Sequence, residues 1–315
     1  MLIDRSGAGD ATGNKQLEIL IKHLLTRVGG IPGPPVDLCK VIAPRTSHSS
    51  SALLAPRHED EFLESAYANG GDGTLFELEL IYYPTTANAA GYKQPQPDNV
   101  LGVDFQDLGG DPELYRYNFM IKNHRDADDY RPLMRLGRTL GLAGPTFEAQ
   151  TRDAMDLEAW TRAWALVSLC GVGDSYTFGN DHNLLVYLRP DDGRFVPFLV
   201  DMDFSFVRGA TSGLLGDRNL TRVFNLPANL RRFYAHVLDL IEAGFNPAYM
   251  GPWITHYNRF VPEQNFASIT EYIRQRGDYA VATIHAAGGN APFTVLGPPR
   301  SPQPPTWSPS PAPPR

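Results

Sequence analysis

The chain has 315 residues, a length that favours one or two domains and allows a sizeable apolar core. Its 35 acidic residues outnumber its 28 basic ones, and the net charge of -7 argues against nucleic acid as a partner, because phosphate groups are met by a basic face. The two cysteines, neither of them in a CxxC motif, exclude a disulfide framework.

Short strands and helices alternate over about the first 140 residues. Apolar residues at helical spacing from Leu17 to Val28 predict a helix within residues 12–28, ended by Gly29 and Gly30. Further along, alternation and turn residues predict strands at 36–42 and on either side of a Ser-rich turn at 46–51, a helix at 59–67, a strand at 74–83, a loop at 84–112, a strand at 115–122, a helix at 128–140 and a turn at 141–145.

The clearest helical pattern covers residues 153–170. Leu157, Trp160, Trp164 and Val167 fall on one face of this helix. Tryptophans four residues apart on an apolar face are typical of a core, so we expect both to be buried.

The segment 171–206 is the most informative part of the sequence. A polar loop leads into a strand at 184–188, and a turn at 189–193 connects it to a second strand at 194–200. A hairpin brings the start of its first strand beside the end of its second. The polar loop before Leu184 and the carboxylates after Val200 are therefore expected to lie together.

Six aspartates lie between positions 174 and 203, and two of them, Asp191 and Asp192, are explained by the turn. Carboxylates that converge repel one another unless a cation compensates them. Carboxylate and amide oxygens suit Mg²⁺, Mn²⁺ or Ca²⁺, whereas a single histidine is weak evidence for zinc. Helix caps, turns and solvated carboxylates remain the alternative to a metal site. The residues in question are Asp174, Asp181, His182, Asn183, Asp201 and Asp203.

The order of these residues follows the logic of phosphoryl transfer in protein kinases. One aspartate accepts the hydroxyl proton, an asparagine a few residues on holds metal, and another aspartate beyond a short hairpin holds metal as well. Asp174, Asn183 and then Asp201 or Asp203 have this order. The usual HRD, DFG and GxGxxG motifs are absent from the sequence.

Four stretches together resemble the CotH kinase family, the spore coat protein H type of atypical protein kinase. The most specific stretch reads GDSYT at 173–177 and continues through residues 180–183, and the second covers the hairpin and ends in DMDF at 201–204. The outer stretches are GTLFE at 73–77 with 115–122 and the helix from 128, and the helical region 229–284. The resemblance spans about residues 12–285.

The resemblance implies an α+β protein with a divergent protein-kinase-like fold. One domain is expected over residues 1–290, with a small mixed or antiparallel β lobe over about 1–140 and a helical lobe over about 141–290. Nine of the eighteen residues from Pro298 to Arg315 are proline, which predicts a disordered tail over 291–315.

The activity implied by the resemblance is transfer of the γ-phosphoryl group of ATP, with Mg²⁺ or Mn²⁺, to a Ser or Thr of a coat or surface protein. Asp174 matches the catalytic aspartate, with Asp181 as a competitor for that role. Asn183 matches the amide ligand of the metal, and Asp201 and Asp203 match the acidic metal-binding pair.

The chain departs from the family at its start. Members carry an Arg-Gly-Asn type motif and basic residues before the first helix, whereas residues 1–14 alone precede it here. The nucleotide-binding lobe is therefore expected to be incomplete at its N-terminus and to lack the usual phosphate-contacting base. Lys122 is the candidate for phosphate contact, with a plain strand-end lysine as its alternative. The hydroxyls and N–H groups of the turn at 45–51 offer a partial substitute for a phosphate loop.

Two other functions remain open. One is a catalytically inactive CotH-like coat, surface or adhesion protein, and the other is a metal-dependent hydrolase that uses the same polar cluster. No apolar run reaches the roughly 20 residues of a membrane span, and the first ten residues contain no signal-peptide core. The expectation is a cytoplasmic protein as the chain is written, or a secreted or surface protein if the natural chain starts upstream.

Overall fold

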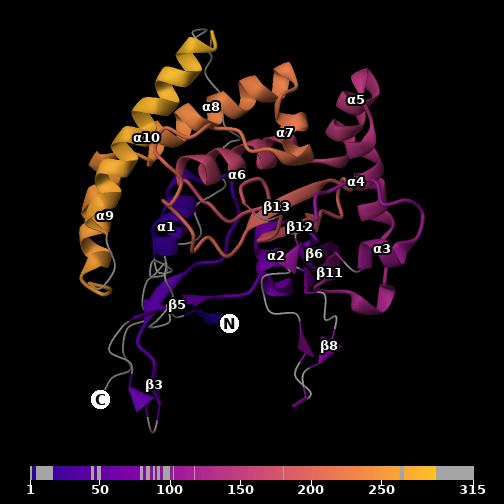
Figure 1. Cartoon of the computed structure of the whole chain (residues 1–315), viewed down its shortest axis with the longest axis horizontal. Helices are drawn as coiled ribbons and strands as arrows, with labels where there is room; N and C mark the ends of the chain where they lie inside the picture. The colour runs from indigo at the N-terminus through magenta and orange to yellow at the C-terminus, as the bar shows by residue number, and fades with distance from the viewer. Residues whose placement is uncertain are drawn as a thin grey trace, which may run out of the picture.

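The computed structural model of the chain confirms the α+β class, with helices around small antiparallel sheets (Figure 1). The expected tail at 291–315, residues 48–50 of the Ser-rich turn and Asn180 lie outside the described residues. The structure describes residues 2–4, 17–43, 46–47, 51–78, 81–82, 86–87, 89–90, 93–94, 100–101, 103–116, 118–179, 181–262 and 266–288.

Helices are concentrated in the second half of the chain, and strands in the first. The helices are α1 (Glu18–Val28), α2 (Asp60–Ala66), α3 (Pro112–Arg116), α4 (Arg131–Gly141), α5 (Gly144–Ala154), α6 (Leu157–Leu169), α7 (Arg218–Phe224), α8 (Pro227–Ala243), α9 (Pro247–Asn258) and α10 (Ala267–Ala286). The strands are β1 (Leu2–Asp4), β2 (Asp37–Cys39), β3 (Ile42–Ala43), β4 (Thr46–Ser47), β5 (Ala52–Ala55), β6 (Thr74–Leu78), β7 (Ile81–Tyr82), β8 (Thr86–Ala87), β9 (Lys93–Gln94), β10 (Val100–Leu101), β11 (Phe119–Ile121), β12 (Leu184–Leu188) and β13 (Phe195–Leu199). Within the described parts of the chain, no helix combines the length and apolar character needed to cross a membrane.

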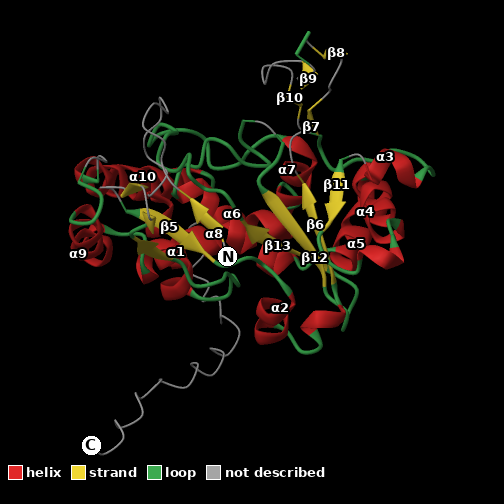
Figure 2. Ribbon diagram, turned by 90° about the horizontal axis from the view of Figure 1, so that it is seen from below, coloured by secondary structure: helices red, strands yellow, loops and turns green. Residues whose placement is uncertain are grey.

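A four-stranded antiparallel sheet with the order β11-β6-β12-β13 forms the centre of the molecule. The predicted hairpin is confirmed, with Leu184 opposite Leu199 and Leu188 opposite Phe195. Because β6 pairs with both β11 and β12, strands from both sides of residue 140 share this sheet. Figure 2 shows α3, α4 and α5 beside the β11 edge of the sheet.

Both faces of the central sheet are buried. Alternate side chains of a strand point to opposite faces, so Leu184 and Val186 enter the main core, while Leu185 and Tyr187 enter a smaller cluster with Leu63 of α2. A second sheet, with the order β1-β5-β2, lies near α1 (Figure 2).

The predicted burial of the two tryptophans of α6 is confirmed. Trp160 and Trp164 are 1% and 3% exposed, and each indole N–H has a hydrogen-bond acceptor. Trp160 Nε1 donates to the backbone oxygen of Phe195 in β13 (2.8 Å), and Trp164 Nε1 donates to Thr177 Oγ1 (2.6 Å). These bonds connect α6 to the hairpin and to the polar loop before it.

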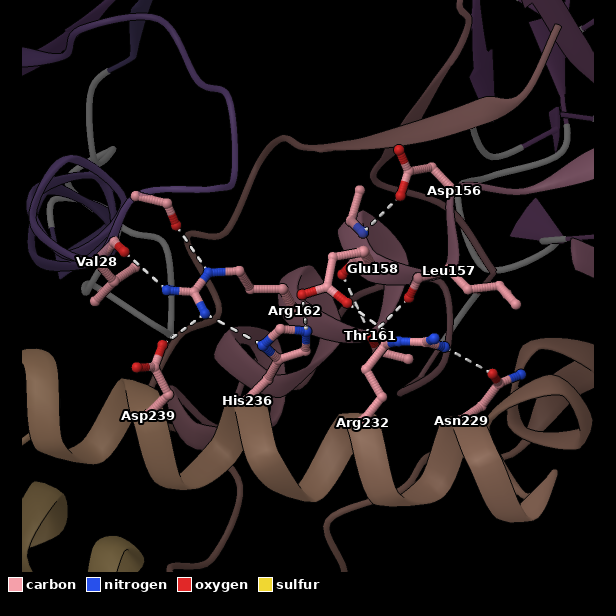
Figure 3. A network of polar contacts seen from close by, with 12 residues as sticks. Val28, Asp156, Leu157, Glu158, Thr161, Arg162, Asn229, Arg232, His236 and Asp239 are labelled. Carbon is pink, nitrogen blue, oxygen red and sulfur yellow. Dashed lines mark hydrogen bonds and ion pairs between the residues drawn. The ribbon is translucent and has the colours of Figure 1, made fainter. Parts of the chain in front are cut away.

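The C-terminus of α1 is fixed to the helical part of the molecule by Arg162 of α6 (Figure 3). Its guanidinium donates to the backbone oxygens of Val28 (2.7 Å) and Gly29 (2.8 Å), and to Asp239 of α8 (2.6 Å). The last carbonyls of a helix lack intrahelical partners, and a basic side chain satisfies them well. As expected, Gly29 ends this helix, with a φ of 65°.

The helix predicted over 153–170 is confirmed as α6, but its predicted start is wrong, because residues 153–154 end α5 and α6 begins at Leu157. Asp156 lies between them and is the N-cap of α6, where its carboxylate accepts the backbone N–H of Ala159 at 3.1 Å. A side-chain cap of this kind starts a new helix. The turn predicted at 141–145 is too long, because α5 already begins at Gly144.

Three predicted strands also need correction. The strand at 115–122 is confined to β11, because Pro112 starts α3 and the Asp111 carboxylate caps it by accepting the N–H of Glu113 (3.0 Å). The strand at 36–42 divides into β2 and β3, and the one at 74–83 into β6 and β7, and in each case the two pieces belong to different sheets.

Candidate functional site

A cavity of about 960 Å³ opens where the two strands of the hairpin meet the polar loop. Its volume lies at the upper end of the roughly 300–1,000 Å³ range of small-molecule sites. Residues of α1, β5, the segment 56–61, β6, the segment 122–125 and the open end of the hairpin line it. The open end of the hairpin thus faces a space large enough for a nucleotide.

Asn183 and Asp201 both line this cavity, as the hairpin geometry predicts. Asn183 directly precedes β12, and Asp201 follows β13 by two residues. Both have left-handed backbones, with φ of 57° and 47°. Asn and Asp adopt this region more readily than other non-glycine residues, but it remains uncommon. Strained residues of this kind cluster at functional sites.

Asp174 lies next to Asn183, although it does not line the cavity. The Asn183 side-chain amide donates to the backbone oxygen of Asp174 (3.0 Å), which leaves the amide oxygen of Asn183 for a donor or a cation. The Asp174 carboxylate, 27% exposed, lies 3.3 Å from His182 Nε2. Gly179 keeps the loop tight, because its φ is 92° and a Cβ there would lie 2.5 Å from the oxygen of Gly173.

The remaining predicted acids lie off the cavity wall. Asp181, the competitor for the catalytic role, accepts a hydrogen bond from Arg218. Burial raises the pKa of Asp181, and Arg218 partly offsets this effect. Asp203 is 8% exposed and does not line the cavity. An ion pair therefore accounts for Asp181, and Asp174 stays the better candidate for the base.

Two of the three predicted metal ligands, Asn183 and Asp201, line the cavity, whereas Asp203 does not. In the described residues there is no group of three or more His, Cys, Asp or Glu side chains placed to hold a metal ion. Asn183 and Asp201 offer the cavity one amide and one carboxylate. Mg²⁺ commonly takes one or two carboxylates from the protein and the rest of its ligands from water and substrate phosphates.

Two lysine–glutamate pairs line the same cavity. Lys122, the predicted phosphate contact, has its Nζ 2.5 Å from Glu77 Oε2, and its side chain is 35% exposed. Lys22 has its Nζ 3.1 Å from Glu18 Oε1, and its side chain is 7% exposed. Sequence reasoning did not identify Glu18 and Lys22 as site residues. The available signal is two opposite charges four residues apart within an apolar helical stripe.

The rest of the cavity wall includes apolar side chains and a neutral histidine. His58 stacks on Phe198, with 5.2 Å between the ring centroids. Burial, helped by the nearby charge of Lys22, lowers the pKa of His58 to about 3, so the imidazole is neutral at physiological pH. Apolar residues of β5, β6 and β12, and the residue after β13, line the cavity with it: Leu53, Leu75, Leu185 and Val200.

Comparison of the sequence with models of known protein families finds no match, and a search of curated proteins finds no matching relative. The cavity, its polar residues and their order in the sequence are the features that indicate a function.

Proposed function

We propose that the cavity binds ATP together with Mg²⁺ or Mn²⁺, and that the protein is an atypical Ser/Thr protein kinase with a divergent kinase-like fold. One observation carries the proposal: Asn183 and Asp201, at the open end of one hairpin, both line a cavity that has an apolar and a charged wall. A nucleotide has the same division, because its base is flat and weakly polar while its phosphates are anionic.

The roles of the polar residues follow from their positions. The amide oxygen of Asn183 and the carboxylate of Asp201 would hold the divalent ion, which supplies positive charge to the phosphate oxygens during transfer. Asp203, two residues after Asp201, is also predicted to bind the metal, but it does not line the cavity. Asp174, beside Asn183, would accept the hydroxyl proton of the protein substrate as that oxygen bonds to the γ-phosphorus. The bond from the γ-phosphorus to the β–γ bridging oxygen breaks, and ADP leaves. The protein substrate implied by the CotH resemblance is a coat or surface protein.

Phosphoryl transfer to a general acceptor protein tests this proposal. The full chain is incubated with Mn²⁺ and γ-labelled ATP, and the label on acceptor Ser and Thr residues is located by mass spectrometry. We expect labelling by the wild-type protein, and loss of labelling with retained nucleotide binding in Asp174→Asn. A wild-type protein that binds no metal–ATP would contradict the proposal.

One observation favours a second candidate, a catalytically inactive CotH-like coat, surface or adhesion protein. The Asp174 carboxylate lies beside His182 rather than on the cavity wall. A cavity of this kind could hold a nucleotide without transferring its phosphoryl group. Saturable Mn-ATP binding without phosphorylation of an acceptor protein and without autophosphorylation would favour this candidate over the kinase.

A further inference from the structure

Glu18 and Lys22 form an ion pair that is almost completely buried. Their side chains are 6% and 7% exposed, and the residues around them on α1 are apolar core members such as Ile19 and Ile21. A buried pair of charges adds little to stability, because desolvation offsets most of the attraction. Apolar side chains at both positions would serve the fold about as well. The pair therefore points to a role in the cavity that it lines.

A hydrogen bond fixes the Lys22 ammonium at the open end of the hairpin. Its Nζ donates to the backbone oxygen of Leu199 at 3.1 Å, across 177 positions of the sequence. Leu199 is the last residue of β13, two positions before Asp201. An ammonium group has three N–H donors, and among the described residues Glu18 and Leu199 take two of them. One donor remains beside the expected metal site.

The helix that carries this lysine is held firmly. Arg162 binds the carbonyls of Val28 and Gly29 at the C-terminus of α1 and connects them to Asp239 of α8 (Figure 3). One face of α1 is buried in the main core. The position of the Lys22 ammonium is therefore set by the fold before any ligand arrives, which lowers the entropy that binding must overcome.

We propose that Lys22 is the cation that contacts the nucleotide phosphates. In typical protein kinases this lysine lies on a strand and pairs with a glutamate on a helix. Here one helix would supply both residues, Lys22 and Glu18, one turn apart. The proposal rests on the nucleotide-binding function proposed above and assigns one more residue to the same cavity.

Lys122 is the competing candidate, and its surroundings suit the role less well. Its ammonium is held by Glu77 at 2.5 Å, and its side chain is 35% exposed, so solvent screens its charge. Its backbone N–H donates to the oxygen of Leu75 in β6 (2.8 Å). Lys122 follows β11, the edge strand of the sheet opposite β13 and Leu199. We expect Lys122 to contribute little to phosphate binding.

Calorimetric titration of the full chain compares the two lysines. The variants are Glu18→Gln/Lys22→Met, which removes both charges and so leaves no buried charge unpaired, and Lys122→Met as the matched control. We expect the double variant to bind Mn-ATP about tenfold or more weakly, because a hydrogen bond to a charged group is lost. Affinity for adenosine, which has no phosphates, should stay within about twofold. Lys122→Met should lose much less Mn-ATP affinity than the double variant, because solvent already screens the Lys122 charge.

Labelling of the wild-type protein provides a measurement that depends on no variant. An ATP acyl phosphate transfers its acyl group to an amine beside the bound phosphates: an amide bond forms on Nζ, the mixed anhydride breaks and ATP leaves. Mass spectrometry should find the acyl group on Lys22, and excess Mn-ATP should suppress it.

The outcomes separate the two proposals. Acylation of Lys122 in place of Lys22, or a double variant that binds Mn-ATP like the wild type, overturns the role of Lys22 and leaves the nucleotide site standing. A wild-type protein that binds no Mn-ATP and is not acylated overturns both.

Discussion

Both ends of the β12–β13 hairpin have aspartates and residues with a left-handed backbone, but these features differ between the two ends. At the turn end, Arg189 holds Asp192 with 2.6 Å between Nη2 and Oδ2, and Gly193 takes the left-handed backbone position with a φ of 65°. At the open end, the left-handed positions belong to Asn183 and Asp201, whose side chains line the cavity. The turn end uses the residue types that stability favours, and the open end does not.

The difference separates a structural use of aspartate from a functional one. Glycine reaches positive φ without steric conflict, and an arginine beside a carboxylate compensates its charge. Both features satisfy local needs of the turn. At the open end, non-glycine residues bear the strain of a left-handed backbone, which costs roughly 1–2 kcal/mol for most L-residues. We infer that position in the fold, rather than number of aspartates, identifies the candidate site.

Removal of a carboxylate from each end should give the largest contrast. Asp201→Ala is expected to weaken Mn-ATP binding by about 100-fold, since even outer-shell changes at metal sites cost 10–100-fold. Asp191→Ala, in the exposed turn, should change the affinity less than about twofold. Calorimetric titration of both variants measures the two affinities. Equal Mn-ATP affinities of Asp201→Ala and Asp191→Ala would contradict a binding role for the open end alone.

Loss of the arginine at the turn should affect stability alone. Arg189 pairs with Asp156 as well as Asp192, so Arg189→Met is expected to lower the free energy of unfolding by about 1–2 kcal/mol at pH 7. Mn-ATP affinity should not change. Urea denaturation measures the first effect, and a large loss of Mn-ATP binding would contradict the second.

The same arginine makes part of this stability depend on pH. Its hydrogen bond holds the pKa of Asp192 below the usual range. A carboxyl group with a lowered pKa in the folded protein stabilises it above the unfolded value of about 3.9, and this contribution disappears as the pH falls through the folded value. The difference in stability between wild type and Arg189→Met should therefore shrink below about pH 4. A difference that stays constant down to pH 2 would rule out this linkage.

Glycine substitutions test the backbone strain, with the smallest effects. Asp201→Gly is expected to be more stable than Asp201→Ala by about 1 kcal/mol, because glycine tolerates the left-handed φ. Gly193→Ala at the turn should lose about the same amount. Thermal unfolding of the three variants gives these differences. Greater stability of Asp201→Ala than of Asp201→Gly would refute the strain at this position.

The hairpin could be predicted from the sequence because it depends on residues close together in the chain. The same holds for the approach of the polar loop before Leu184 to the carboxylates after Val200. Two apolar runs, 184–188 and 195–199, and the turn at 189–193 between them determine the register, and the register brings Asn183 to the same end as Asp201. The burial of Trp160 and Trp164 also follows from a local helical pattern. The break between α5 and α6 was missed because Asp156 caps a helix inside a continuous helical pattern, and one side-chain contact outweighs that pattern there.

The role proposed for Lys22 could not be predicted from residues close to it in the sequence. Lys22 interrupts an apolar run, and its meaning depends on a bond to Leu199, 177 positions away. No periodicity or spacing records such a contact. The sequence offers Lys122 as a phosphate contact, with a plain strand-end lysine as the alternative, and the structure places it on the cavity wall in a pair with Glu77. The class of fold and the hairpin were thus predictable, whereas the charged wall of the cavity required tertiary structure.

We propose above all that the open end of the hairpin binds a divalent ion together with a nucleotide. A crystal of the full chain grown with Mn²⁺ and a non-hydrolysable ATP analogue tests this claim most directly, because the anomalous signal of manganese locates the ion. We predict a manganese peak between Asn183 and Asp201, with the phosphates of the analogue beside it. A nucleotide bound at another site, or a manganese peak away from both residues, would contradict the account.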